Sequence, residues 1–459
     1  MEANQEQNKI GGEIKEIEAG IPDIKTNKGI NLTIRALVVF ILIMVLMIPM
    51  AFIGELVRER SYRQEEVKRE VSSKWAADQR LTGPILIIPY KGDAVKDKDG
   101  KIIEYETDNL YILPNILNIS GVITPHTRHR SIFDVTVYQA ELNISGNFDS
   151  LDIKKLQIPT ENLYLKDAQL YFGIDDFRGL EEQLKIKWGG NIVEFTAGTL
   201  NPAFRENGLY APVAVTAEDI NRRIDFSMGA KIKGSEELLF TPIGKTNTTH
   251  ISSSWGNPSF TGNFIPNNPA DVTSQGFEAD WNILYLNRNY PQVWKNTRYN
   301  TEESQYGVCL LQSVDSYAKT SRAQKYAILF ISLTFALYFF VEILQKRKVH
   351  PVQYALVGIA LCLFYVLLLS ISEYLSFNFA YMAAALATIL LITLYTKSAF
   401  VKWRIAMVFG AVLSLLYIFI FILIQLEDKA LLFGSIGLFA LLAVVMYYSR
   451  KIEWYGQSN

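Results

Sequence analysis

VHPVQYALVGIALCLFYVLLLSISEYLS (residues 349–376) is the stretch of sequence that decides the fold. Nineteen residues within it, 354–372, carry no charged side chain. At a rise of about 1.5 Å per residue, a helix of this length extends about 30 Å, which matches the hydrocarbon core of a bilayer. This segment is therefore predicted to be a transmembrane helix.

Five other apolar segments of comparable length predict a polytopic α-helical membrane protein with six spans. They are 36–57, 327–344, 379–395, 405–426 and 430–448, so that residues 326–448 form a five-helix membrane domain. The first segment contains Pro49 and is followed by the charged run RERSYRQEEVKRE instead of a small-residue cleavage site. We therefore predict an uncleaved signal-anchor helix over residues 36–57.

Lysine and arginine are unevenly distributed over the connections between these segments. Basic residues at 346–348, 397–404 and 450–451 alternate with connections that hold few or none. The positive-inside rule then places the N- and C-termini in the cytoplasm and residues 58–325 outside. Basic residues that follow the first span oppose this locally, but glutamates are interleaved with them and long domains cross largely regardless of charge.

The remaining segments complete the predicted organisation. Residues 1–31 are rich in Glu, Lys, Asn and Gly and are predicted to be a disordered cytoplasmic tail. Residues 58–80 are strongly charged, with apolar side chains at helical spacing, and predict a charged helical stalk. Residues 449–459 are predicted to be a second cytoplasmic tail.

Residues 81–325 show the period-two pattern of β-strands. Apolar side chains alternate with polar ones over 224–232 and again over 277–285. Short strands bounded by Gly, Asn and Pro predict a large β-rich periplasmic domain between spans 1 and 2, either an antiparallel sandwich or an α+β fold. Within 133–144 the apolar residues move from odd to even positions, which predicts a β-bulge near Val137.

Composition and motifs exclude several function classes. The net charge of −1 over 459 residues, without a basic stripe, argues against a nucleic-acid partner. Cys309 and Cys362 belong to different regions, so no disulfide framework is predicted. No catalytic signature is present, and His126 and His129 lack the further ligands that a metal needs. We therefore predict neither an enzyme nor a bound metal or cofactor.

Ionisable side chains at membrane depth are often functional, because they are costly to bury. Glu373 closes the 354–372 span and is the main candidate, although at a span end a carboxylate can also be interfacial or structural. Glu342 is predicted to pair with Lys346 one helical turn later. His350, before Pro351, is predicted to start the following helix.

Several long motifs resemble the CreD family of bacterial inner-membrane proteins. They are LTGPILIIPY (81–90), RSIFDVTVYQAELNISGNF (130–148), DDFRGL (175–180), SSWGNPSFTGNFIP (253–266), GFEADWNILYLNRNYPQVW (276–294), TSRAQKYAILFISLTFALYFFVE (320–342) and 349–377. The resemblance extends from about residue 35 to the C-terminus. One departure is Tyr374, where a histidine is expected after Glu373, so a Glu-His proton relay is not expected here.

The resemblance implies a multi-pass protein of the bacterial inner membrane that is tied to cell-envelope integrity. It implies a role in responses to envelope damage, including tolerance of cell-wall antibiotics and colicins. It supplies no enzymatic activity, cofactor or active site to carry over. Membrane lipids, and an envelope component or envelope protein in the periplasm, are the implied partners.

The leading hypothesis is a periplasmic sensor or scaffold domain without enzymatic activity. Its contact surfaces are predicted in the loops 253–266 and 287–294, although Gly, Pro, Asn and aromatic residues there also serve turns and cores. The candidate functional residues are Trp255, Phe260, Asn263, Arg288 and Asn289, together with Glu373 and Tyr374 of the membrane domain. The alternative is a transporter or flippase-like protein for an envelope component, which requires polar groups or broken helices near mid-bilayer. A hydrolase would need a nucleophile and a base, which no spacing reveals.

Overall fold

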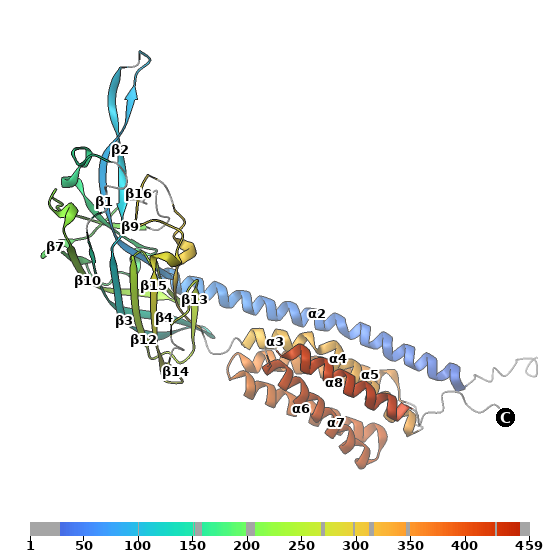
Figure 1. The fold of residues 1–459 in the computed structure, drawn as a ribbon. Coiled ribbons are helices and arrows are strands. Elements are labelled where there is room, and N and C mark those ends of the chain that lie inside the picture. Colours follow the sequence, from blue (N-terminus) through green and yellow to red (C-terminus); the bar gives the residue numbers. More distant parts are fainter. Residues whose placement is uncertain are drawn as a thin grey trace, which may run out of the picture. The chain divides into compact units, whose positions relative to one another are not determined.

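A computed structural model of the chain describes residues 28–99, 101–149, 151, 158–198, 207–267, 271–296, 299–311, 316–345, 349–426 and 429–449. The predicted tails, up to residue 27 and from residue 450, lie outside the described residues. The chain divides into two compact units, one of residues 1–61 with 315–459 and the other of residues 62–314. The first unit is helical and the second is rich in β-strands (Figure 1).

The helical unit contains the six predicted apolar segments and one helix that the sequence did not indicate. Its helices are α2 (Lys28–Trp75), which continues into the second unit, α3 (Ser316–Lys325), α4 (Ala327–Leu344), α5 (Pro351–Ser372), α6 (Phe377–Phe400), α7 (Trp403–Gln425) and α8 (Ala430–Ser449). Helix α3 occupies residues that we had assigned to the β-rich domain. The start of α5 is as predicted, since His350 caps it by accepting a hydrogen bond from Val352 N (3.3 Å) and Pro351 is its first residue.

Five of these helices, namely α2, α4, α5, α6 and α7, are long and apolar enough to cross a membrane. Helix α8 covers the sixth predicted span, with a shorter apolar segment over Ala430–Ala440. Large aliphatic side chains on the outside of the bundle, such as Leu390 and Leu415, are exposed in the described structure, as expected of residues that face lipid. The bundle interior is rich in aromatic residues, and Leu46 and Met50 of α2 pack into the same core.

The β-rich unit contains two sheets (Figure 1). Its described strands are β1 (Gln79–Lys96), β2 (Ile102–Ile112), β3 (Ile116–Arg130), β4 (Phe133–Phe148), β5 (Gln169–Ile174), β6 (Lys185–Trp188), β7 (Asn191–Glu194), β8 (Thr196–Ala197), β9 (Asn207–Pro212), β10 (Ile224–Ser235), β11 (Glu237–Phe240), β12 (Thr246–Ser253), β13 (Pro258–Gly262), β14 (Asp271–Thr273), β15 (Gly276–Leu284), β16 (Val293–Lys295) and β17 (Tyr306–Leu310).

Among these strands, the nine-stranded sheet has the order β13-β17-β11-β1-β5-β9-β8, with β2 also paired to β1 and β16 paired to β2. The eight-stranded sheet has the order β14-β15-β12-β3-β4-β10-β6-β7. Both sheets are mixed instead of purely antiparallel, because β1 pairs with β11, and β3 with β12, in parallel. Side chains of both sheets form one contiguous core, as in a sandwich.

The predicted alternation is confirmed in β10 and β15, where buried and exposed residues alternate along the strand. The bulge predicted near Val137 is wrong, because β4 pairs with β3 in unbroken register through this point and with β10 in unbroken register up to Val137. Val135 and Val137 are buried on the face opposite the sandwich core. The end of α2 lies near them, since Trp75 donates a hydrogen bond to Tyr138 O (3.4 Å). The apolar residues of β4 shift from odd to even positions because the strand is covered on its second face near Val137, and not because it contains a bulge.

Acidic side chains gather where α2 ends and β1 begins. Asp78 is an exposed residue, but partial desolvation raises the pKa of its carboxyl to about 6, and the nearby Glu236 and Glu237 carboxylates contribute to the rise. Lys68 of α2 binds Glu236 (3.0 Å), and Ser235 Oγ donates to Ala76 O (2.6 Å), so helix and sheet are joined by several polar contacts at this point. The charge on Asp78 therefore opposes folding of this junction.

We predict that Asp78→Asn stabilises the β-rich unit at neutral pH more than at acidic pH. The folded-state pKa is about 6, against an ordinary value of 3.8, so protonated Asp78 contributes stability that is present in full below the ordinary value. That contribution is lost as the pH rises through 6, whereas the neutral amide of asparagine does not ionise and loses no stability over the same range. Urea unfolding of the full-length protein at several pH values, followed by tryptophan fluorescence, measures the difference. An equal gain at pH 4 and pH 7 would contradict the prediction, and the exposed Asp225→Asn is the control.

Candidate functional site

Glu373 lies at one end of the helical unit, which we call the Glu373 end, and binds two other helices there. It caps the C-terminus of α5, and its side chain is 11% exposed. Arg60 of α2 approaches its Oε1 atom at 3.6 Å, and the Tyr317 hydroxyl of α3 donates to the same atom at 3.3 Å. One carboxylate therefore joins α2, α3 and α5.

Further polar contacts at the Glu373 end join α3 to α6 and α7. Lys319 of α3 donates to Gln425 Oε1 (3.2 Å), and Gln425 donates to Asn378 Oδ1 (2.6 Å). Tyr374, which follows Glu373, is 77% exposed and belongs to neither set of contacts described here. The structure thus separates the two membrane-domain candidates, since Glu373 is bound among helices and Tyr374 is on the surface.

Glu342 is a second buried carboxylate, at the opposite end of α5, which we call the Glu342 end. Its side chain is 3% exposed and accepts hydrogen bonds from Arg35 of α2 (3.3 Å), the Tyr354 hydroxyl (2.6 Å) and Val349 N (3.2 Å). The predicted partner Lys346 lies outside the described residues. Sequence reasoning missed Arg35 and Tyr354, because neither is near Glu342 in the chain.

The interior of the bundle also holds tyrosine hydroxyls whose contacts in the described structure fall short of normal hydrogen-bond geometry. Among the described residues, the Tyr338 and Tyr417 hydroxyls are buried and make no hydrogen bond of normal geometry. Thr388 lies near Tyr417, but its own hydroxyl donates to Ala384 O (2.9 Å). Buried hydroxyls of this kind are commonly satisfied by internal water.

In the β-rich unit, Trp255 and Phe260 belong to the packed interior. Phe260 of β13 makes edge-to-face contacts with Phe277 and Trp281, with ring centroids 5.7 and 5.8 Å apart. Trp255 packs partly against the same core and donates to Leu311 O (3.0 Å). Trp255 therefore joins the chain before β13 to the residue after β17, and Phe260 packs β13 onto β15, so both side chains have structural roles.

Asn263 and Asn289 are the exposed candidate residues of the β-rich unit. Asn263 follows β13, and its backbone N–H donates to Gln305 O (2.8 Å), so the side chain is displayed from an anchored backbone. Asn289 lies between the buried residues Arg288 and Tyr290. Both side chains are therefore open to a partner while the backbone near them is held.

Arg288 is a buried cation that binds backbone carbonyls. It is 7% exposed, stacks on the Tyr290 ring (4.1 Å to the centroid), and donates to Ile243 O (3.1 Å), Tyr290 O and the Gln292 side chain. Burial lowers the pKa of its guanidinium to about 10, and no described carboxylate bonds to it. Its position indicates that it fixes the loop after β15.

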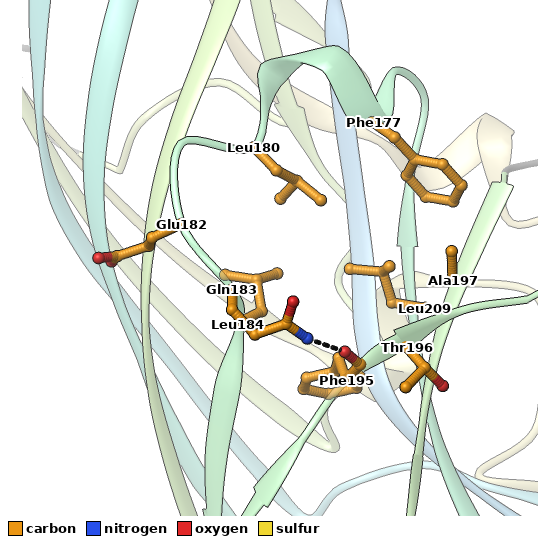
Figure 2. Close-up of a pocket in the computed structure, with 9 residues that line it drawn as sticks. All are labelled: Phe177, Leu180, Glu182, Gln183, Leu184, Phe195, Thr196, Ala197 and Leu209. Atoms are coloured by element: carbon orange, nitrogen blue, oxygen red, sulfur yellow. Dashed lines mark hydrogen bonds between the residues drawn. The ribbon is translucent and has the colours of Figure 1, made fainter.

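A pocket of about 350 Å³ opens in the β-rich unit (Figure 2). Its lining is mostly apolar and consists of Phe177, Leu180, Glu182, Gln183, Leu184, Phe195, Thr196, Ala197 and Leu209. Gln183 donates to Phe195 O at its edge, and Glu182 points away from the other side chains (Figure 2). No converging set of acid, base or nucleophile faces this pocket, and the chain just beyond Gly198 lies outside the described residues.

His126 and His129 lie on β3, and each binds one neighbouring side chain. His126 is 3.1 Å from Gln139 Oε1, and His129 bonds to Asp134. Within the described ranges, no three His, Cys, Asp or Glu side chains gather as metal ligands would. Burial raises the pKa of the Cys309 thiol to about 11, so this thiol is a poor nucleophile at neutral pH.

Together these features define a multi-pass membrane protein with a large β-rich domain whose described clusters serve to hold elements together. The family described as "Inner membrane protein CreD" matches residues 31–455. The inner membrane protein CreD of Escherichia coli (strain K12) is 28% identical over 420 residues, which cover 91% of this chain and 92% of that protein. The chain belongs to the CreD family, and it is a multi-pass protein of the inner membrane.

We predict that Arg288→Ala lowers the unfolding free energy of the β-rich unit by about 2 to 3 kcal/mol, because it leaves buried carbonyl groups without their charged donor. Asn289→Ala, at the exposed neighbouring position, should change it by less than about 0.5 kcal/mol. Native-state hydrogen exchange of the slowest amides in the full-length protein measures both values. Equal effects of the two substitutions would contradict the structural role of Arg288.

Proposed function

We propose that this protein supports cell-envelope integrity during envelope stress, with the β-rich unit acting in the periplasm as a sensor or scaffold without enzymatic activity. The observation that carries the proposal is the continuity of α2, which runs as one helix from the membrane unit to the start of β1. Glu373 binds both α2 and α3, which are the two helices adjoining the β-rich unit in the chain. A sensor or scaffold needs such a continuous connection, whereas a hydrolase needs a reactive site.

The proposed contact surface includes Asn263 and Asn289. Both are exposed, while Phe260 and Arg288 beside them in sequence hold their loops from within. A fixed loop that displays a polar side chain loses little conformational entropy on binding. The partner proposed for this surface is an envelope component or envelope protein.

A matched set of variants tests the contact surface. In a deletion strain under cell-wall stress, the wild-type protein should restore a low uptake of a membrane-impermeant dye. The double variant Asn263→Ala, Asn289→Ala at the same membrane level should raise uptake toward that of the deletion strain. The double variant Asn118→Ala, Asn143→Ala, on exposed positions of β3 and β4, should behave as wild type. Full protection by the Asn263, Asn289 variant would refute the proposed surface.

The proposed topology has six spans, with both termini in the cytoplasm and the β-rich unit in the periplasm. The alternation of basic and non-basic connections supports it, as does the helical extent of α8, which would supply the sixth span. We predict that alkaline phosphatase fused after Asn459 is inactive and that a green fluorescent protein at the same position is fluorescent. The opposite pair of results would overturn this topology.

A transporter or flippase-like protein is the second candidate. The buried Tyr338 and Tyr417 hydroxyls, which make no hydrogen bond of normal geometry among the described residues, favour it, since a polar path through the bundle needs such groups. In the dye-uptake experiment, Tyr338→Phe with Tyr417→Phe removes both hydroxyls and leaves the rings in place. Protection at the wild-type level supports the sensor or scaffold, and its loss at matched protein level supports transport.

A further inference from the structure

Helix α2 is attached firmly to the bundle at the Glu342 end. The Glu342 anchor, which we define as Arg35, Glu342 and Tyr354, buries its carboxylate to 3% exposure and binds it with charged and neutral donors. Close packing supports the anchor further along, since a Cβ at Gly358 of α5 would lie 2.2 Å from a methyl group of Leu46. Arg35 is itself 36% exposed, so the ion pair is only half-buried, and the packing of Leu46, Met50 and Ile53 into the bundle core supplies most of the strength of this attachment.

At the Glu373 end the attachment of α2 is weaker. The Glu373 latch, which we define as Arg60, Tyr317 and Glu373, has long contacts of 3.6 and 3.3 Å. Arg60 is 43% exposed and Arg35 is 36% exposed, so water screens the arginine charge at both ends. The two attachments of α2 therefore differ mainly in apolar packing, because Leu46, Met50 and Ile53 lie in the bundle core and the described core includes no residue of α2 beyond Ile53.

Between the two attachments, α2 contains a weak point over residues 49–54. Pro49 lies inside the helix and has no N–H to donate to the carbonyl of Val45. One residue later, Met50 O accepts a hydrogen bond from Gln324 of α3 (2.8 Å). Gly54 leaves room for that side chain, since a Cβ there would lie 2.3 Å from Gln324 Nε2. Helices bend at prolines and where side chains insert beside the backbone ladder.

We infer that α2 is a hinged helix whose segment beyond Gly54 pivots about residues 49–54 when the Glu373 latch opens, while its Arg35 end stays fixed. Helix α3 contributes to both parts, with Tyr317 at the latch and Gln324 at the hinge. The segment that pivots is the one that continues to Trp75. The inference goes beyond the proposed function, because it concerns the mechanics of α2 whatever the β-rich unit binds.

Distance measurements between spin labels in the full-length protein, in lipid nanodiscs, test this inference. Cys309 and Cys362 are first replaced by alanine, and labels are placed at the exposed positions Glu59 and Phe379. Glu373→Gln and Arg60→Gln are each expected to replace a single narrow distance distribution by a broad one. A second pair of labels, at Leu37 and Leu394 near the Glu342 end, should give an unchanged distribution in both variants.

Three further variants separate the latch from the hinge. The exchange Arg60→Glu with Glu373→Arg should restore the narrow distribution, and so should Pro49→Ala added to Glu373→Gln, because it repairs the helix. Glu55→Gln, which removes an exposed ion pair with Arg58 only, should have no effect.

Unchanged Glu59–Phe379 distances in both latch variants would overturn the latch. Broadening that persists with Pro49→Ala, or that extends to the Leu37–Leu394 pair, would overturn the hinge. Dye uptake is not used here, so failure of the inference leaves the proposed function standing.

Discussion

The structure depends on helix α2, which makes apolar contacts over one part of its length and polar contacts over another. Over residues 46–53, α2 packs apolar side chains into the helical core, whereas near its C-terminal end Lys68 binds Glu236 and Trp75 donates a hydrogen bond to Tyr138 O of β4. A helix with one amphipathic stripe along its whole length could not make both kinds of contact. The sequence of α2 accordingly changes from apolar to strongly charged near Glu55. Because α2 is one continuous helix that ends at Trp75, its course also determines where strand β1 begins.

Most of the architecture could be predicted from the sequence, because hydropathy and strand periodicity are local signals. The apolar segments correspond to helices, the alternation in β10 and β15 is confirmed, and the family resemblance is confirmed over most of the chain. The bulge near Val137 was wrong for an instructive reason. A strand covered on both faces along part of its length gives the same pattern as a strand that changes face, and nothing local distinguishes the two.

The candidate sites were predicted less well, because contacts between distant residues carry no local signal. Glu373 was recognised as a costly charge, but its partners come from residues 60 and 317. Glu342 was assigned to a neighbour in the helix, whereas Arg35, more than three hundred residues away, binds it. Arg288 and Phe260 were chosen for residue type alone, and the structure buries or packs them as supports for exposed asparagines.

The order of strands in the nine-stranded sheet has a consequence for how the protein is assembled from parts. The first strand, β1, and the last, β17, flank the short β11, with Gln79 and Val308 both beside Leu238. Two strand spacings amount to about 10 Å, close to the separation of two packed helices. A unit of some 250 residues whose first and last strands lie this close can be inserted into a helical protein at a single point of its chain. Such a unit is modular, so its surface can diverge while the bundle that carries it keeps its own packing.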